Sequence, residues 1–285
     1  ADCHGKNHFT RGSISRHLIS LHIMLANGEI VEASRETRSD LFWATVGGLG
    51  LTGVIITAKL MLQRISSVYA IHTMKGFNDV DDMINVIEEN KTNYEYLIGA
   101  VDGNFKPGRP WRGSIAVGSI LPPDQIEDSW SLPVRHAAKL PFRNPFPWVD
   151  IAAGRFICHV IGRKFRDGRV DIIDLSRFFF PQESVTNWNL AFDRSGFVDY
   201  QCCVAVDAGR EFFKKMHNFL NRHNVFCFLV AIKRFRAPEW DGPLTFSQDG
   251  FSIALDIPIK PGILDLLHLI DEIVLEFGGR INLIK

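Results

Sequence analysis

The first regular pattern along the chain is an alternation of apolar and polar residues that predicts a β-hairpin. Residues 17 to 25 (HLISLHIML) and 30 to 34 (IVEAS) are both strand-like, and the turn Ala26-Asn27-Gly28-Glu29 lies between them. Asn-Gly between two alternating runs is the strongest short-range hairpin signal. The chain is therefore expected to contain an antiparallel pair of strands near its beginning.

A short helix, a glycine-rich turn and a strand are predicted next. Ser39 and Asp40 are favourable N-caps for a helix over residues 41 to 45. Three glycines follow with the spacing Gly48-x-Gly50-x-x-Gly53, and β-branched residues after them predict a strand over 54 to 62. A Rossmann dinucleotide site needs the reverse order, strand before and helix after. The spacing alone leaves open a plain glycine-rich connection that packs helix against sheet.

The rest of the chain alternates strand-like and helix-like patterns. This order predicts an α+β fold in which one sheet is covered by helices on one face. Asp207 is expected to cap the second helix, and Pro261 to start the third, which Gly278-Gly279 ends. The predicted strands cover residues 68–77, 94–103, 112–121, 197–206, 225–235 and 250–259, and the predicted helices cover 78–89, 207–223 and 261–277. The helical spacing of Ile263, Leu266, Leu267, Ile270, Ile273 and Val274 marks them as core.

Composition narrows the classes of function. Lys plus Arg and Asp plus Glu both number 32, so no overall field attracts nucleic acid. The five cysteines are odd in number and do not form a disulfide framework. No apolar run of about 18 residues predicts a membrane span. Because the chain opens without methionine inside a glycine-rich loop, we expect a fragment of a longer protein. With no transmembrane segment in this chain, we expect it at the cytoplasmic or the periplasmic side of an inner membrane.

Several strings, taken together and in order, resemble the vanillyl-alcohol-oxidase superfamily of flavoenzymes. They are HGKNH (4–8), LFWATVGGLGLTGVI (41–55), PLTF (243–246), DIPIKPG (256–262) and LEFGGR (275–280). The resemblance implies FAD as cofactor and a split architecture. Residues 1–65 would be the second part of the FAD-binding domain, 66–278 a substrate or cap domain with a mostly antiparallel sheet, and 279–285 a return strand into the FAD-binding domain. The first FAD subdomain would lie outside this chain.

The resemblance also implies cofactor-binding residues. His4 would lie beside the flavin ring, and the residues after it would follow the cofactor. Asn282 stands where the family has a flavin-contacting tyrosine. The positions matched to the cofactor are His4, Gly5, Lys6, Asn7, Gly12, Gly48, Gly50, Thr52, Gly53, Val54 and Asn282. Without the resemblance, a histidine in a glycine-bounded loop is more often structural, and Cys3, His4 and His8 lack the second ligand pair of a zinc site.

On the substrate side the resemblance implies a pocket of Gln201, Lys233 and Phe235, with Lys285 near both flavin and substrate. Lys285 and His4 are the catalytic candidates. We assign the hydroxyl or flavin to Lys285 and a phosphate to Lys233, although a basic strand end beside Arg234 and Arg236 can also be merely solvated. Other pocket positions depart from the family: Ala254 replaces a cysteine, Ser252 an asparagine, Phe179 a tyrosine and Ala100 a tryptophan.

These positions predict an FAD-dependent oxidoreductase. It would oxidise a hydroxyl of a sugar, free or linked to a polyprenyl phosphate, by hydride transfer to flavin N5. The alternative is a non-catalytic binding protein that keeps the flavoenzyme fold. A partner reductase and a peripheral membrane contact through the aromatic residues of 140–150 are further candidates, and neither nucleic acid nor a metal is expected.

Overall fold

The computed structural model describes residues 3–126, 138–139, 168, 170–181, 185–187, 195–240, 242 and 244–285. These residues form an α+β structure with a small sheet, a large sheet and one two-stranded pair. The 140–150 segment proposed to meet a membrane falls wholly outside the described residues. The described helices include none that is both long enough and apolar enough to cross a membrane.

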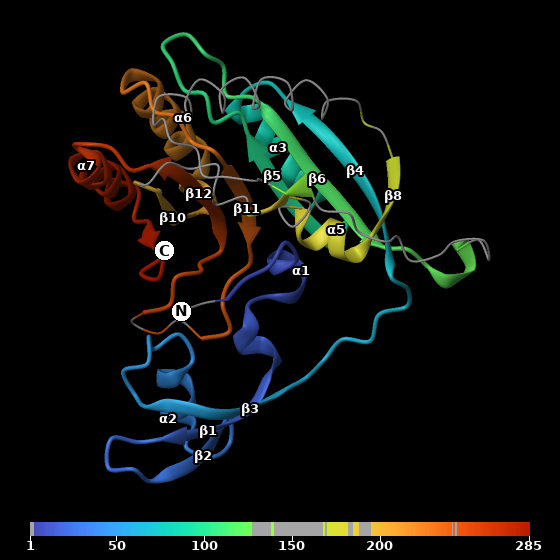
Figure 1. Ribbon diagram of the computed structural model, residues 1–285, viewed down its shortest axis with the longest axis vertical. Coiled ribbons are helices and arrows are strands. Elements are labelled where there is room, and N and C mark those ends of the chain that lie inside the picture. Colours follow the sequence, from blue (N-terminus) through green and yellow to red (C-terminus); the bar gives the residue numbers. More distant parts are fainter. Residues whose placement is uncertain are drawn as a thin grey trace.

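The small sheet has the order β2-β1-β3 and includes the predicted hairpin. Its strands are β1 (Leu18–Met24), β2 (Ile30–Ser34) and β3 (Val54–Leu60), all antiparallel. The turn closes with Leu25 N donating to Glu29 O at 2.8 Å, and Gly28 takes a φ of 83° there. In Figure 1 this unit lies at the opposite end of the molecule from the large sheet's helices. The hairpin prediction is confirmed.

Helix α2 (Ser39–Thr45) covers one face of the small sheet. Phe42 is fully buried there and packs with Leu21 and Ile23 of β1. The predicted helix is confirmed, but its predicted caps are wrong: the N-cap is Arg38, in a left-handed conformation with φ 49°, and no side chain caps the helix. Ser39 and Asp40 instead occupy the first turn, where an acidic side chain stabilises the helix by interacting with the positive end of its dipole.

The large sheet has eight strands in the order β13-β10-β12-β11-β5-β6-β4-β8. All its pairings are antiparallel, as predicted. The strands are β4 (Tyr69–Phe77), β5 (Tyr96–Val101), β6 (Gly113–Ile120), β8 (Val170–Asp174), β10 (Phe197–Ala205), β11 (Val230–Phe235), β12 (Gly250–Pro258) and β13 (Arg280–Ile281). The predicted strand over 225–235 is therefore too long at its start. Strand β13 pairs with β10 and so extends the large sheet. The chain therefore stays in this sheet after residue 278, where the cap domain was predicted to end.

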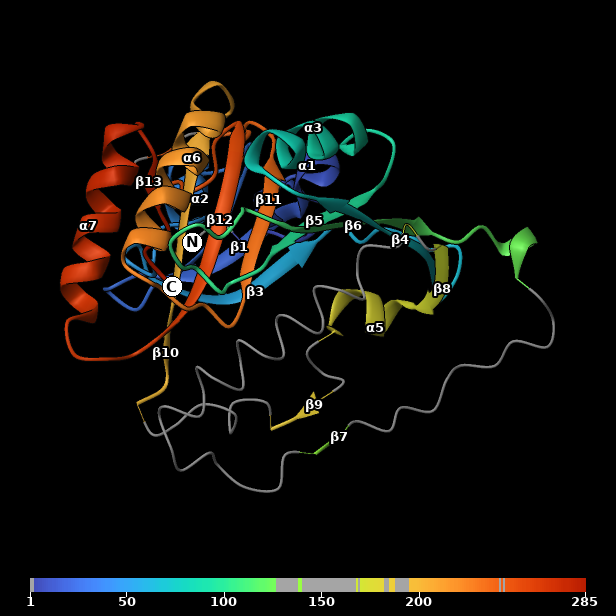
Figure 2. The ribbon, with the colours of Figure 1, turned by 90° about the horizontal axis from the view of Figure 1, so that it is seen from above.

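Helices α3 (Val80–Asn90), α6 (Val206–Arg222) and α7 (Ile263–Glu276) lie on one face of the large sheet (Figure 2). Their apolar stripes meet the inward side chains of the strands in one core, which includes Met83, Phe212 and Ile270. The six core positions predicted for α7 are confirmed, three of them buried and three partly buried. Asp207 lies in the first turn of α6, and the cap position predicted for it belongs to Ala205.

The large sheet is built from two units with the same connectivity. One runs β4-α3-β5-β6 and the other β10-α6-β11-β12, and each places its last strand between its other two. The units meet where β5 pairs with β11. No fixed period in the sequence indicates this repetition, because it is a repetition of topology. It places the helices of both units on the same face and leaves the other face of β10, β12, β11 and β5 clear of them.

Two short helices lie at that second face. Helix α5 (Leu175–Phe179) covers its β4 end, where Phe178 packs against His72 and Tyr96. The N-terminal helix α1 (His8–Arg11) contacts β11. The other described elements are the 3-10 turns η1 (Ile14–His17) and η2 (Pro123–Gln125) and the parallel pair β7 (Ala138–Lys139) and β9 (Val185–Thr186).

Candidate functional site

Polar side chains gather on the face of the large sheet that the three helices leave open, which we call the open face. Cα partners in neighbouring strands present their side chains to the same face. Gln201 pairs with Ala254, Lys233 with Ser252, and Asp199 with Asp256. The alternate residues of β10 and β12 enter the core under the helices. Period-two alternation thus sorts apolar residues to the helix side and this polar set to the open side.

A chain of hydrogen bonds joins the N-terminal loop to the open face. Ile284 N donates to Asn282 Oδ1 at 3.3 Å, and Asn282 Nδ2 donates to Gln201 Oε1 at 2.9 Å. The amide nitrogen of Gln201 therefore faces away from Asn282. It donates to Ser252 Oγ and meets His4 Nε2, both at 2.9 Å. Because an amide nitrogen only donates, His4 Nε2 is the acceptor in this arrangement.

Aromatic rings surround the histidines of this loop. The His4 ring lies 4.8 Å from that of Phe235 and 5.8 Å from that of Phe246, measured between centroids. His8 is tilted over Phe235 at 4.2 Å, and its Nδ1 accepts from Arg236 N. Phe235 is fully buried between these rings. The imidazole of His4 is thus held by the amide of Gln201 and by ring contacts that include Phe235, Phe246 and His8.

Three lysines and two carboxylates give the site its electrostatics. Lys285 Nζ forms an ion pair with Asp199 Oδ2 at 2.6 Å. Burial, with Lys285 and Lys6 nearby, lowers the pKa of Lys233 to about 8 against the opposing effect of Asp199. Burial also lowers the pKa of Lys6, whose Nζ donates to Phe178 O, to about 8. Burial and the neighbouring Asp199 raise the pKa of Asp256 to about 7, although Lys285 acts in the opposite direction.

Small residues lie beside this polar set. Ala254 pairs with Ala231 across β12 and β11, and Ala231 pairs with Ala100 across β11 and β5. The three alanines therefore lie in a row on the open face, next to Gln201. Two of them, Ala254 and Ala100, stand where the resemblance led us to expect larger side chains. At this row the open face consequently presents only methyl side chains.

The structure divides the predicted site residues into two places. Around the open face lie His4, Lys6, Gln201, Lys233, Phe235, Ser252, Ala254, Asn282 and Lys285. Phe179 lies beside them, edge-on to Tyr96 at 5.0 Å and next to the residue that Lys6 contacts. Gly5, Asn7 and Gly12 belong to the loop and helix that carry His4 and His8. The glycine-rich residues 48 to 53, between α2 and β3, and Val54, the first residue of β3, lie apart.

The glycine-rich loop has the connection that excludes a Rossmann site, because a helix precedes it and a strand follows. Close backbone contacts explain two of its glycines. A Cβ on Gly48 would lie 2.0 Å from Ala44 O, and a Cβ on Gly53 would lie 2.4 Å from Met24 O. Gly50 meets nothing within 4 Å and is needed for its φ of 79° alone. Thr52 Oγ1 bonds Thr45 Oγ1 at 2.9 Å, and the outer turn, residues 49 to 51, is exposed.

Alanine substitutions at two of these glycines should differ sharply in their effect on stability. Gly53→Ala must relieve a contact with the backbone of β1 at a φ of 150°, so we expect a loss of about 3 kcal/mol in the free energy of unfolding. Gly50→Ala meets open space and should lose about 1 kcal/mol for its left-handed φ. Urea unfolding of both variants measures the difference. Equal losses would show that the contact with Met24 is not what requires Gly53.

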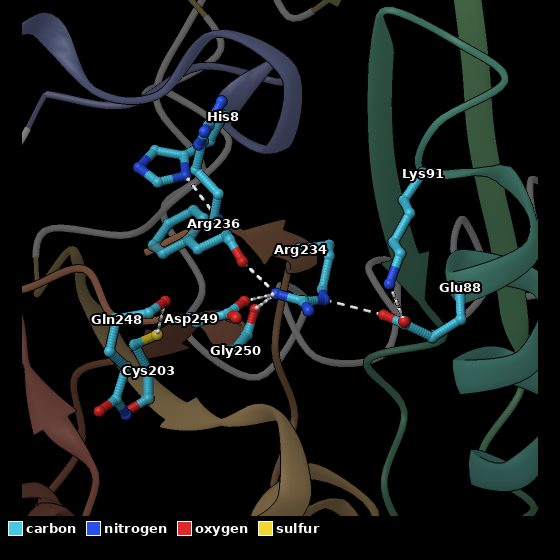
Figure 3. A network of polar contacts seen from close by, with 10 residues as sticks. His8, Glu88, Lys91, Cys203, Arg234, Arg236, Gln248, Asp249 and Gly250 are labelled. Atoms are coloured by element: carbon cyan, nitrogen blue, oxygen red, sulfur yellow. Dashed lines mark hydrogen bonds and ion pairs between the residues drawn. The ribbon is translucent and has the colours of Figure 1, made fainter. Parts of the chain in front are cut away.

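Sequence reasoning missed Asp199, Asp256 and Arg234. The first two lie two residues from Gln201 and Ala254 on the same strands, so the period of two could have placed them on the same face. Arg234 was grouped with Lys233 as a basic strand end, but its side chain is only 5% exposed and faces the helices. Figure 3 shows it between Glu88 of α3 and Asp249, with the carbonyl of Gly250 beside it.

Two surface hollows lie away from these residues. One of about 440 Å³ is lined by Arg16, Arg35 and Glu239 among others, and one of about 560 Å³ lies between α6 and α7. Neither is lined by a predicted site residue. The candidate site is therefore the open face itself rather than either hollow.

No protein-family model matches the chain. Three curated proteins show what it resembles. A decaprenylphosphoryl-beta-D-ribose oxidase of Mycolicibacterium smegmatis is 33% identical over 291 residues, which cover 100% of this chain and 63% of the oxidase. An uncharacterized protein from the mprA 5′ region of Streptomyces coelicolor is 27% identical over 100% of this chain and 80% of its own length. An FAD-linked oxidoreductase of Aspergillus fumigatus is 31% identical over 25% of this chain and 14% of its own length.

The chain thus spans less than two thirds of the oxidase that it matches. The match nevertheless runs through all of the strings on which the resemblance was based, since it covers the whole chain. The resemblance is confirmed: over its full length the chain is a relative of decaprenylphosphoryl-beta-D-ribose oxidase, and over a shorter stretch of an FAD-linked oxidoreductase.

Proposed function

We propose that this chain is part of an FAD-dependent oxidoreductase that oxidises a hydroxyl group of a sugar, free or linked to a polyprenyl phosphate. The observation that carries the proposal is the contact between His4 and Gln201. It joins the loop matched to the flavin with the strand matched to the substrate pocket. Residues 1–65 would contribute to the FAD-binding domain, 66–278 would form the cap, and 279–285 would lead back toward the cofactor.

The residues on the open face suit FAD in their chemistry. Amide, imidazole and ammonium groups can form hydrogen bonds with the oxygens and nitrogens of a flavin and with a pyrophosphate. Asn282 and Gln201 are buried and hold fixed orientations through their mutual hydrogen bond. In the glycine-rich loop, Gly50 is exposed and carries no side chain that would block the approach of a ligand to the backbone.

In the proposed reaction, bound FAD supplies the hydride acceptor. Lys285 is a cation in its ion pair with Asp199, so it would stabilise negative charge that develops on the substrate oxygen. Lys233 would bind a phosphate, and the nearby positive charges of Lys6 and Lys285 would stabilise an anion there. His4 would be kept in one orientation by Gln201 and Phe235. The row of alanines would admit the sugar.

A second candidate is a non-catalytic protein that binds a ligand without turnover. Substitutions at the pocket and flavin-contacting positions favour it. The residues that differ from those of the family are Ala100, Phe179, Ser252, Ala254 and Asn282. Hydrogen bonds still connect two of these substituted residues, Ser252 and Asn282, through Gln201. We therefore favour an altered substrate over lost activity. A partner reductase, and a membrane contact through 140–150 at either side of an inner membrane, remain parts of this proposal.

Flavin content tests the proposal most directly. The full-length protein, purified without added cofactor, should be yellow and release FAD on denaturation. Anaerobic addition of the sugar substrate should bleach the flavin absorption. A colourless protein that takes up no added FAD would contradict the enzymatic proposal, and a yellow protein that no sugar or prenyl-phosphate sugar bleaches would favour the non-catalytic candidate.

A further inference from the structure

Two carboxyl groups lie side by side at the edge of the candidate site. Asp199 of β10 and Asp256 of β12 are Cα partners, so their side chains share the open face with Gln201 and Ala254. Directly opposed residues in an antiparallel pair have Cβ atoms about 5 Å apart. Asp199 uses Oδ2 for its ion pair with Lys285. Its Oδ1 is buried and has no hydrogen-bond partner among the residues that the structure describes.

Among the residues that the structure describes, two charged groups act on Asp256. Asp199 faces it from β10, and Lys285 faces it from the segment after β13. Residues 228 and 229, beside Asp256 and before β11, carry no charged side chain. Their hydrogen bonds go to the main chain of Asp256: Phe228 N donates to Asp256 O, and Asp256 N donates to Leu229 O. Burial and Asp199 raise the pKa of Asp256 to about 7, with Lys285 opposing. Two half-buried carboxylates at this separation favour a state in which one of them is protonated.

The proposed function needs a proton acceptor that the residues considered so far do not supply. Oxidation of an alcohol sends a hydride to the cofactor and releases the hydroxyl proton. Lys285 in its ion pair is already a cation and has no lone pair for that proton. His4 Nε2 is engaged by the amide of Gln201. A carboxylate that titrates near neutral pH is the kind of group that general base catalysis uses.

We propose that Asp199 and Asp256 form a proton-sharing carboxyl pair that takes up the proton lost by the substrate hydroxyl. This inference rests on the proposed function. Bound FAD would accept the hydride, with the electron pair of the C–H bond. The proton of the O–H bond would pass to the Asp256 carboxylate as the carbonyl forms. Asp199 keeps Lys285 beside the oxygen throughout. The pair thus separates two tasks: Lys285 stabilises charge, and Asp256 receives the proton.

The pair predicts how the rate depends on pH. The accepting form is the ionised Asp256, which predominates above its pKa of about 7. Below that pH the pair already holds a proton. The rate constant for flavin reduction should therefore rise with pH, by about tenfold per unit below the inflexion, and level off above it.

Asp256→Asn in the full-length, flavin-loaded protein tests this. The variant should still bind flavin, lose about 100-fold in the rate of flavin reduction at pH 8, and lose the inflexion near pH 7. Asp207→Asn is the matched control, because Asp207 is exposed on α6 at the opposite face of the sheet. It should keep both the rate and the inflexion. Infrared difference spectra of the oxidised proteins should show a carboxyl C=O band titrating near pH 7 in the wild type and not in Asp256→Asn.

The infrared readout separates the two proposals. A wild-type protein whose flavin no sugar reduces would contradict the proposed function, and the band would still show whether the carboxyl pair exists. An inflexion that survives Asp256→Asn, or that Lys233→Met removes in its place, would overturn the assignment. Absence of a carboxyl band titrating near neutral pH in the wild type would overturn it as well.

Discussion

Arg234→Met is expected to lower the free energy of unfolding by about 2–4 kcal/mol. The guanidinium is buried and makes charge-assisted hydrogen bonds to two carboxylates, Glu88 Oε1 at 2.8 Å and Asp249 Oδ1 at 2.6 Å. It also donates to the carbonyls of Phe235 and Gly250. Methionine fills much of the same volume and makes none of these bonds. The loss leaves carbonyl oxygens buried without this donor, which is more costly than losing an exposed pair.

The position of Arg234 explains why one residue has this effect. It lies on the helix face of β11 and joins α3, through Glu88, to the turn that leads into β12 (Figure 3). These elements belong to the two different β-α-β-β units, so Arg234 fastens one unit to the other. Lysine has a single ammonium in place of a planar fork and cannot reach both carboxylates with the same geometry. Arg234→Lys should therefore recover less than half of the lost stability.

Arg210→Met provides the control for this prediction. Arg210 also connects α6 to α3, through Asp81, but both side chains are largely exposed. Exposed ion pairs contribute little because water and salt screen them. Urea unfolding should show a small change for Arg210→Met and a large one for Arg234→Met. Similar values for the two variants would mean that the Arg234 network contributes no more than a surface pair.

The sequence predicted most elements because their patterns are local. Alternation over residues 68–77 and 250–259 and helical spacing over 263–277 correspond to β4, β12 and α7 within a few residues. The strand predicted from residue 225 was too long. Its sequence is a continuous apolar run, and without a periodic pattern the residues before the strand cannot be distinguished from the strand itself. Helix caps were wrong at Ser39 and Asp207, since a side chain suited to capping can equally occupy the first turn.

The site was predictable only where a resemblance supplied the positions. Gln201 and His4 are 197 residues apart, and no local pattern indicates that they meet. Asp199 and Asp256 become neighbours through the pairing of β10 with β12, which the sequence does not specify. Lys233 and Arg234 are adjacent in the chain and similar in charge, yet the pleat sends one to the open face and the other into the core. Strand pairing, a long-range property, decides which polar residues form the site.

Lys285→Ala should slow flavin reduction by about 100-fold to 1,000-fold, because it removes the cation that Asp199 holds at the site by an ion pair. The structure also distinguishes between two ways in which a lysine could act. As an ion-paired cation, Lys285 would stabilise negative charge on the substrate oxygen, and arginine at this position would keep the positive charge. As a base it would need its neutral form, which arginine cannot provide at neutral pH. Rapid-mixing measurements of flavin reduction at saturating substrate isolate this step.

Lys285→Arg should therefore be faster than Lys285→Ala by at least about tenfold, while Lys106→Ala, at an exposed position distant from the site residues, should match the wild type. Flavin content should be equal in all four proteins, so that the rates compare turnover and not loading. If Arg and Ala at position 285 are equally slow, the charge alone is not what Lys285 contributes, and the ion pair with Asp199 would then serve to hold Asp199 beside Asp256. That outcome would assign the main catalytic role to the carboxyl pair. Because Lys285 lowers the pKa of Asp256, loss of the cation would raise this pKa, and the pair would then accept the proton only at a higher pH than it does now.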